Sequence, residues 1–177
     1  GGYGDSGAVF TDDDRLNQVM RELRVHGQDR RYHHARLGLN ARMDSIQASI
    51  LLAKLGIFPE EIRARPEIAG RYQRDLTTAG IEVTEVRECN MSVFAQFTIR
   101  VNSRDRVAAA LSSAGVPSAV HYPIPLYRQP ALLRSDVSLP ETEKACGQVL
   151  SLPMHPYLTP GEQDLVVGTL IDACVAG

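Results

Sequence analysis

The spacing of apolar residues predicts a helix near the start of the chain. Apolar side chains recur at intervals of three and four residues, at Leu16, Val19, Met20 and Leu23. This is the spacing of one face of an α-helix. Thr11 precedes three consecutive aspartates, and an N-cap hydroxyl followed by negative charge in the first turn favours a helix start. We therefore expect a helix that begins after Thr11 and ends near Val25.

A glycine-rich segment precedes this helix. Gly4-Asp5-Ser6-Gly7 leads into Ala8-Val9-Phe10, which predicts a loop followed by a short buried strand. A phosphate-binding loop leads into a helix N-terminus, whose amide groups bind the anion. Because this loop leads into a predicted strand, it is only a weak candidate for phosphate binding.

Two helices are predicted between residues 44 and 80. The first has apolar residues on most of its sides, so we expect it to be buried; they are Ile46, Ile50, Leu51, Leu52, Ala53, Leu55 and Ile57. Asp44 and Gln47 have the spacing of a capping box at its start. The second helix begins near Pro59, and Pro66 in its interior predicts a kink or a break.

The pattern changes after residue 80. Apolar and polar residues alternate over residues 93–101, which predicts a half-buried strand. Ser103 is expected to cap a helix that ends at Gly115, and a short strand is expected over residues 118–122. One further helix is expected over residues 141–150, and a last one begins with a capping box at Thr159. We therefore divide the chain into residues 1–85 and a small α/β domain over residues 86–177.

Composition narrows the class of protein. Of the 177 residues, 44% are apolar and 23% charged, and the net charge of −2 argues against a general nucleic-acid binder. No apolar run reaches the length of a membrane span, and no signal-peptide pattern is present. Three cysteines without metal-type spacing favour a reducing, cytoplasmic setting. Lys54 and Lys144 are the only lysines, and both are expected at the surface.

Two segments carry candidate binding groups. Residues 26–42 are rich in arginine and histidine and predict a long ordered loop, in which arginines either bind carboxylates and phosphates or face water. His33 and His34 are adjacent, with no carboxylate at ligand spacing, so no metal site is expected. His121 and Tyr122 stand at a strand end before two prolines, where they either bind a ligand or pack.

Several segments taken together resemble one family. In chain order they are GGYGDSGAVFTDDDRL, LRVHGQ, YHHARLGLNARMDSIQASILLAKL, VHYPIPLYRQP and LSLPMHPYLT. They resemble the DegT-like nucleotide-sugar aminotransferases over essentially the whole chain, and GLNARMDSIQA and HYPIPL are specific to that family. The resemblance implies an α/β fold that is the C-terminal part of a fold-type I pyridoxal-phosphate-dependent transferase. Its parts would be the end of the large domain, a helical connection and a small α/β domain with a short, mainly antiparallel sheet.

The resemblance also implies roles for particular residues. Asn40 matches an asparagine that reaches the cofactor phosphate across a dimer interface, and Arg42 matches a position that contacts the sugar from the partner subunit. His121 and Tyr122 match a loop that lines the nucleotide-sugar site. The lysine that binds the cofactor is expected three residues upstream of the position of Gly1. No catalytic residue is therefore expected in this chain, which would be inactive alone.

The activity implied is a ping-pong transamination with pyridoxal 5'-phosphate. An amino group from glutamate would pass to the 3-keto position of UDP-2-acetamido-2-deoxy-3-oxo-glucuronate, in lipopolysaccharide O-antigen biosynthesis. The enzyme would be a homodimer with active sites shared between subunits. Two alternatives are a sugar dehydratase of the same family, with histidine in place of the lysine, and a non-catalytic nucleotide-sugar-binding or dimerisation module.

Overall fold

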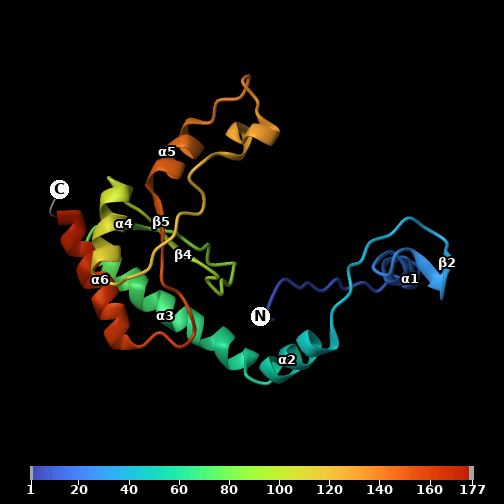
Figure 1. Cartoon of the computed structure of the whole chain (residues 1–177). Coiled ribbons are helices and arrows are strands. Elements are labelled where there is room, and N and C mark those ends of the chain that lie inside the picture. Colours follow the sequence, from blue (N-terminus) through green and yellow to red (C-terminus); the bar gives the residue numbers. More distant parts are fainter. Residues whose placement is uncertain (1, 176–177) are drawn as a thin grey trace. The chain divides into compact units, whose positions relative to one another are not determined.

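The computed structural model describes residues 2–175, and the chain forms two compact units, Gly1–Pro59 and Glu60–Gly177. The first unit contains helix α1 (Asp14–Leu23), the antiparallel strands β1 (Gln28–Arg30) and β2 (His33–His34), and helix α2 (Ser45–Leu55) (Figure 1). The Arg/His-rich loop that the sequence predicts is therefore ordered, and it contains a short hairpin.

The predicted helix near the start is present, but its cap differs. Asp13 is the N-cap, and its Oδ1 accepts a hydrogen bond of 3.0 Å from the backbone N–H of Leu16. Thr11 instead accepts one from the N–H of Asp13. The prediction that Thr11 caps the helix is wrong because the aspartate two positions later makes the capping contact.

Two predictions of burial in the first unit are also wrong. Residues 8–10 form no strand, and the exposed fractions of Val9 and Phe10 are 77% and 90%. A strand needs a partner for its backbone groups, and none of the strands in the described residues pairs with this segment. Helix α2 has no buried residue, and Leu52 is 70% exposed.

The predicted capping box at the start of α2 is not formed. Asp44 is the N-cap but makes no side-chain capping bond. Gln47 is used elsewhere: its Oε1 accepts from the N–H of Tyr3 at 2.8 Å and its Nε2 donates to the carbonyl of Tyr3 at 2.5 Å. This pair fixes the N-terminal segment against α2.

Helix α3 (Phe58–Thr78) runs without a break through Pro66, so the break considered from the sequence does not occur. Its buried face belongs to the core of the second unit, with Ile68, Ala69, Tyr72 and Leu76. This packing explains why the compact units divide at residues 59/60, earlier than the domain boundary expected near residue 85.

The second unit is built on an antiparallel sheet of order β3-β4-β5, formed by Glu82–Val83, Phe97–Arg100 and Val149–Leu152. Helices α3, α4 (Arg104–Ser113) and α6 (Pro160–Val175) accompany it (Figure 1). Buried side chains from these three helices and from β4 and β5 form one apolar core. The expected small α/β domain with a short antiparallel sheet is confirmed.

The strand and helix limits in this unit differ locally from the predictions. Burial alternates along β4 as expected, but the strand begins only at Phe97, after Phe94 adopts a positive φ of 45°. Helix α5 (Pro140–Gln148) ends before Leu150, and β5, which no pattern predicted, follows at once.

The short strand expected over residues 118–122 is reduced to one bridge, because the segment after α4 pairs with β5 only through Ala119 and Ser151. Two 3-10 turns, Leu126–Arg128 and Pro130–Leu132, lie between this segment and α5.

Two helix-end predictions in this unit are confirmed, while Ser103 stands at the N-cap of α4 without a side-chain capping bond. Gly115 has a φ of +74° after α4, and its N–H and that of Val116 bond the carbonyls of Ser112 and Leu111. At the start of α6, Glu162 accepts from the N–H of Thr159 at 2.8 Å. Within the described residues, every helix is too short or too polar to cross a lipid bilayer.

Candidate functional site

The segment that follows α1 is held by backbone hydrogen bonds over its whole length. The N–H of His26 donates to the carbonyl of Leu39 at 2.8 Å, and the N–H of Leu39 donates to Leu23 at 2.8 Å. The N–H of Ala41 donates to the carbonyl of Arg24 at 2.9 Å, and Val25 forms a β-bridge with Asn40. These bonds fix residues 39–41 against the end of α1.

Glu22 is the buried charge at the centre of this arrangement. It is 6% exposed, and its carboxylate accepts from Arg36 Nε at 2.7 Å and from Gln18 Nε2 at 2.9 Å. The hydrogen bond from Arg36, followed by that from Gln18, lowers the pKa of the Glu22 carboxyl. Arg36 Nε is thus bound within the loop.

Two glycines allow the loop to close on itself. Gly27 has a φ of +73°, and a Cβ there would lie 1.9 Å from the carbonyl oxygen of Arg36. A Cβ on Gly38 would lie 2.1 Å from the backbone nitrogen of Gly27. Both positions therefore require glycine.

A groove of about 1110 Å³ opens beside this segment in the first unit. Its basic side chains are Arg21, Arg24 and Arg42, and its walls include Asp5–Val9, Leu39 and residues of α1 and α2. The side chains of Arg21 and Arg24 make no hydrogen bond or ion pair with any residue in the described part of the chain. Arg42 belongs to the basic segment of residues 26–42 indicated by the sequence, and Arg24 lies just before that segment. Arg21, one helical turn before Arg24, has no such signal.

Asn40 and Arg42 are brought together. Arg42 Nε donates to Asn40 Oδ1 at 3.3 Å, and both side chains are exposed. This contact uses one oxygen of the Asn40 amide and leaves its NH₂ group, two hydrogen-bond donors, without a partner among residues 2–175. The amide can therefore donate to an anion while its oxygen is held.

Several other side chains of the loop make local contacts. His33 Nδ1 lies 2.6 Å from Asp29 Oδ1, and this hydrogen bond lowers the pKa of the Asp29 carboxyl. Arg31 stacks over the ring of Tyr32, with Cζ 4.8 Å from its centroid. Within the described residues, no three histidine, cysteine or acidic side chains are grouped as a metal site would require.

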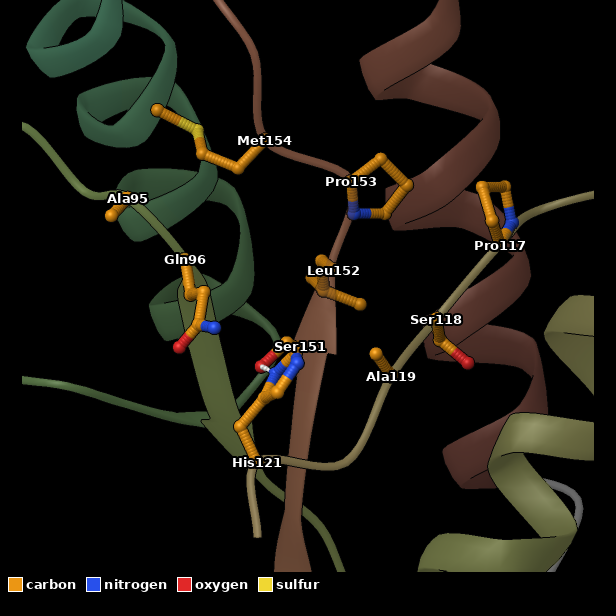
Figure 2. Close-up of a pocket in the computed structure, with 10 residues that line it drawn as sticks. All are labelled: Ala95, Gln96, Pro117, Ser118, Ala119, His121, Ser151, Leu152, Pro153 and Met154. Carbon is orange, nitrogen blue, oxygen red and sulfur yellow. Dashed lines mark hydrogen bonds between the residues drawn. The ribbon is translucent and has the colours of Figure 1, made fainter. Parts of the chain in front are cut away.

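A second cavity, of about 250 Å³, lies in the second unit and contains His121 (Figure 2). It is lined by residues 95–96, 117–119, 121 and 151–154. His121 Nδ1 lies 3.0 Å from Ser151 Oγ, which lies 3.0 Å from Thr98 Oγ1. Ser151 was not predicted from the sequence, because the pattern around its strand indicated a helix and then a loop.

Tyr122 is placed differently from His121. It is 70% exposed and does not line this cavity, although the two rings meet edge to face with centroids 5.5 Å apart. The peptide bond between them is cis. The carbonyl of Pro153, a residue of the cavity lining, accepts a hydrogen bond of 3.2 Å from the hydroxyl of Tyr72, and burial raises the pKa of this phenol.

The two lysines lie outside both cavities. Lys54 on α2 has its Nζ 5.4 Å from the centroid of the Tyr3 ring. Lys144 is exposed on α5. Neither lines the groove or the His121 cavity, and Lys144 is exposed as expected, whereas Lys54 is half-buried.

The fold is that of known sugar aminotransferase structures. A DegT/DnrJ/EryC1/StrS aminotransferase from Brucella abortus superposes with a TM-score of 0.86 at 37% identity, over 93% of this chain and 45% of that one. NtdA of Bacillus subtilis, solved with bound cofactor PMP, superposes with a TM-score of 0.79 at 30% identity, over 93% and 41% of the two chains.

The chain belongs to the DegT/DnrJ/EryC1/StrS aminotransferase family, whose sequence model matches residues 2–171. It is 50% identical over 170 residues to UDP-2-acetamido-2-deoxy-3-oxo-D-glucuronate aminotransferase of Pseudomonas aeruginosa, which is 96% of this chain and 47% of the relative. A UDP-N-acetyl-3-dehydro-alpha-D-glucosamine 3-aminotransferase of Acidithiobacillus ferrooxidans is 38% identical over 178 residues, 100% of this chain and 48% of the relative. The chain thus spans about half the length of these curated relatives.

Proposed function

We propose that this chain is the C-terminal part of a pyridoxal-phosphate-dependent aminotransferase. The enzyme transfers an amino group from glutamate to the 3-keto position of UDP-2-acetamido-2-deoxy-3-oxo-glucuronate, in lipopolysaccharide O-antigen biosynthesis. The observation that carries this proposal is the 50% identity, over 96% of the chain, to an aminotransferase named for that substrate.

The groove of the first unit supports an anionic substrate. This UDP-sugar carries a diphosphate and a carboxylate, and guanidinium groups bind such anions through paired hydrogen bonds. Arg21, Arg24 and Arg42 line one groove, whereas Arg36 of the same loop forms an ion pair with Glu22. We assign the sugar contact to Arg42, made from the partner subunit of a homodimer.

Asn40 fits the cofactor phosphate. Its free NH₂ group donates to phosphate oxygens, while the backbone bridge to Val25 and the contact with Arg42 orient the amide. The related structure that contains PMP supports a cofactor of this type. When bound, pyridoxal phosphate supplies the electron sink that labilises a proton next to nitrogen. Asn40 would hold its phosphate across the dimer interface.

His121 and Tyr122 line the nucleotide-sugar site in this proposal. His121 offers a polar ring nitrogen at the rim of a cavity, and Tyr122 offers an exposed ring beside it. Residues 1–85 and 86–177 then correspond to the end of the large domain with its connecting helices and to the small domain of a cytoplasmic enzyme.

The test is an amino-transfer assay on the intact protein that contains this chain. Loaded with pyridoxal phosphate, it should convert glutamate and the 3-keto glucuronate nucleotide into 2-oxoglutarate and the 3-amino sugar, both followed by mass spectrometry. The matched substrate is the 3-keto N-acetylglucosamine nucleotide, which lacks the carboxylate and should react more slowly. Loss of a sugar hydroxyl without amination would identify the dehydratase instead, and equal rates would contradict carboxylate recognition.

A further inference from the structure

The side chains of Ser151 and Thr98 meet because of the way the sheet is paired. Thr98 on β4 and Ser151 on β5 are direct cross-strand partners. Both backbone groups of Ser151 bond Ala119 on its other side, with the N–H donating at 2.7 Å and the carbonyl accepting at 3.1 Å. The Thr98–Ser151 pair is therefore a non-hydrogen-bonded pair of the ladder, in which side chains approach most closely.

Ser151 is consequently a rigid contact for His121. Its exposed fraction is 5%, and its backbone is held between β4 and the segment that carries Ala119. The imidazole lies at the end of that same segment, two residues beyond Ala119, and points toward the Ser151 hydroxyl (Figure 2). The sheet thus fixes the position of the Nδ1 atom of the His121 ring.

Counting hydroxyl protons gives the direction of the two hydrogen bonds. Each hydroxyl has one proton to donate. If Thr98 donates to Ser151 and Ser151 donates to His121 Nδ1, both protons are used and the chain ends on a nitrogen lone pair. Either direction leaves one donor without a protein acceptor, the imidazole Nε2–H in the first case and the Thr98 hydroxyl in the opposite case. His121 lines the cavity, where water or a ligand can accept its proton, whereas the half-buried Thr98 does not line it, so the first direction is favoured.

We propose that Ser151 and Thr98 are positioning residues that hold neutral His121 as the Nε2–H tautomer. The ring then presents a hydrogen-bond donor to an acceptor oxygen of the nucleotide-sugar, a phosphate or a carbonyl group. The contact with the nucleotide-sugar rests on the proposed function. The assignment of the tautomer does not depend on that function. Both hydroxyls act through His121, so they are positioning residues and not catalytic ones.

The first measurement is the tautomer of His121, from ¹⁵N chemical shifts of histidine-labelled intact protein without substrate. The His121 signal is assigned with His121→Asn. We expect the Nε2–H form in the native protein and a mixture of tautomers in Ser151→Ala and Thr98→Val. Ser151→Thr, which keeps the hydroxyl, should restore the native signal. If Ser151→Ala does not fold, the His121 tautomer in Thr98→Val still tests the proposal.

Thr84→Val is the matched control. Thr84 also carries a hydroxyl next to Thr98, but it donates to the backbone carbonyl of Thr98 and not to its side chain. This variant should leave the His121 signal unchanged. A native Nδ1–H tautomer, or a native signal that survives both Ser151→Ala and Thr98→Val, would overturn the proposal.

The second measurement separates binding from folding. Ser151→Ala and Thr98→Val should raise the KM for the nucleotide-sugar about three- to tenfold, the effect of weakening one neutral hydrogen bond, with kcat little changed. A purely structural role would lower the melting temperature without moving KM, and an unchanged KM would overturn the donor role. A protein with the Nε2–H tautomer but no amino-transfer activity would instead contradict the proposed function alone.

Discussion

The carboxylate of Glu22 and the guanidinium of Arg36 form a 2.7 Å ion pair across fourteen residues of chain, and the glutamate is almost completely buried. This contact closes the loop that carries Asn40 and Arg42. A buried carboxylate that keeps its charge depends on such a partner, because removing either member leaves the other without compensation.

The first prediction concerns the pH dependence of this loop. The pKa of Glu22 is lowered from its ordinary value of 4.5, chiefly by the hydrogen bond from Arg36. The ion pair therefore stabilises the folded loop above that value, and its contribution is lost as the pH falls through the lowered folded-state pKa. Glu22→Gln should increase amide exchange at His26 and Leu39 near neutral pH, and this difference should vanish in acid.

The matched control for Glu22 lies in the other unit. Asp136 accepts two hydrogen bonds from Arg134, which also lower its pKa, but the pair is exposed and distant in sequence from the loop. Asp136→Asn should leave exchange at His26 and Leu39 unchanged at every pH. A Glu22→Gln difference that persisted at low pH would show that the ion pair is not its cause.

The second prediction compares two glycines of equal backbone conformation. Gly27 and Gly115 have φ of +73° and +74°, but only Gly27 would bring a Cβ against backbone. Gly115→Ala should cost about 1–2 kcal/mol, the strain of an L-residue in the left-handed region. Gly27→Ala should cost more, because the chain at Arg36 must also move. Denaturant unfolding of both variants measures the difference, and equal costs would contradict the close approach.

Local signals explain what could be predicted from the sequence. The start of α6 was predicted correctly because Thr159 and Glu162 satisfy each other within one turn, and the end of α4 because Gly115 supplies a left-handed residue. Alternation identified Phe97 and Ile99 as the buried face of β4. In each case the residues that determine the structure lie within a few positions of one another.

Long-range pairing explains what could not be predicted. Gln47 has the spacing of a capping residue but bonds Tyr3, 44 residues away. Ser151 lies on a strand only because β4 is available as its partner, and neither its strand nor its contact with His121 has a local signal. The apolar residues of α2 and Val9 predicted burial, yet nothing in the described residues covers them. Within the candidate site, Asn40 and Arg42 were found through the family resemblance, whereas Arg21 required the structure.

The third prediction concerns the arginines of the groove. In the intact enzyme Arg42→Ala should raise the KM for the nucleotide-sugar about ten- to a hundredfold, since it removes a hydrogen bond between two charged groups. Arg21→Ala and Arg24→Ala should also raise KM, and the increase should shrink at high salt. Arg30→Ala is the control, because Arg30 is exposed on β1 and does not line the groove. An Arg30 effect equal to that of Arg42 would indicate only a general loss of positive charge.

The fourth prediction concerns cofactor retention. Asn40→Ala removes the amide that we assign to the cofactor phosphate, so the Kd for pyridoxal phosphate in the intact enzyme should rise about ten- to a hundredfold. Absorbance of the bound cofactor during dialysis measures this loss. Asn102→Ala, which removes an amide bonded to Gln148 in the second unit, should retain the cofactor as the native enzyme does. Unchanged retention in Asn40→Ala would contradict the role.

The last prediction tests whether Asn40 acts across a subunit interface. One subunit carries Asn40→Ala, and the other carries a replacement of the cofactor-binding lysine expected upstream of Gly1. If each site takes its lysine from one subunit and Asn40 from the other, a hybrid dimer has one complete site, and equal random mixing restores about a quarter of native activity at limiting cofactor. If both groups came from the same subunit, every site of the hybrid would be defective and mixing would restore nothing. Recovery of activity in the mixture therefore requires a site shared between subunits, because each parent dimer lacks either the lysine or Asn40.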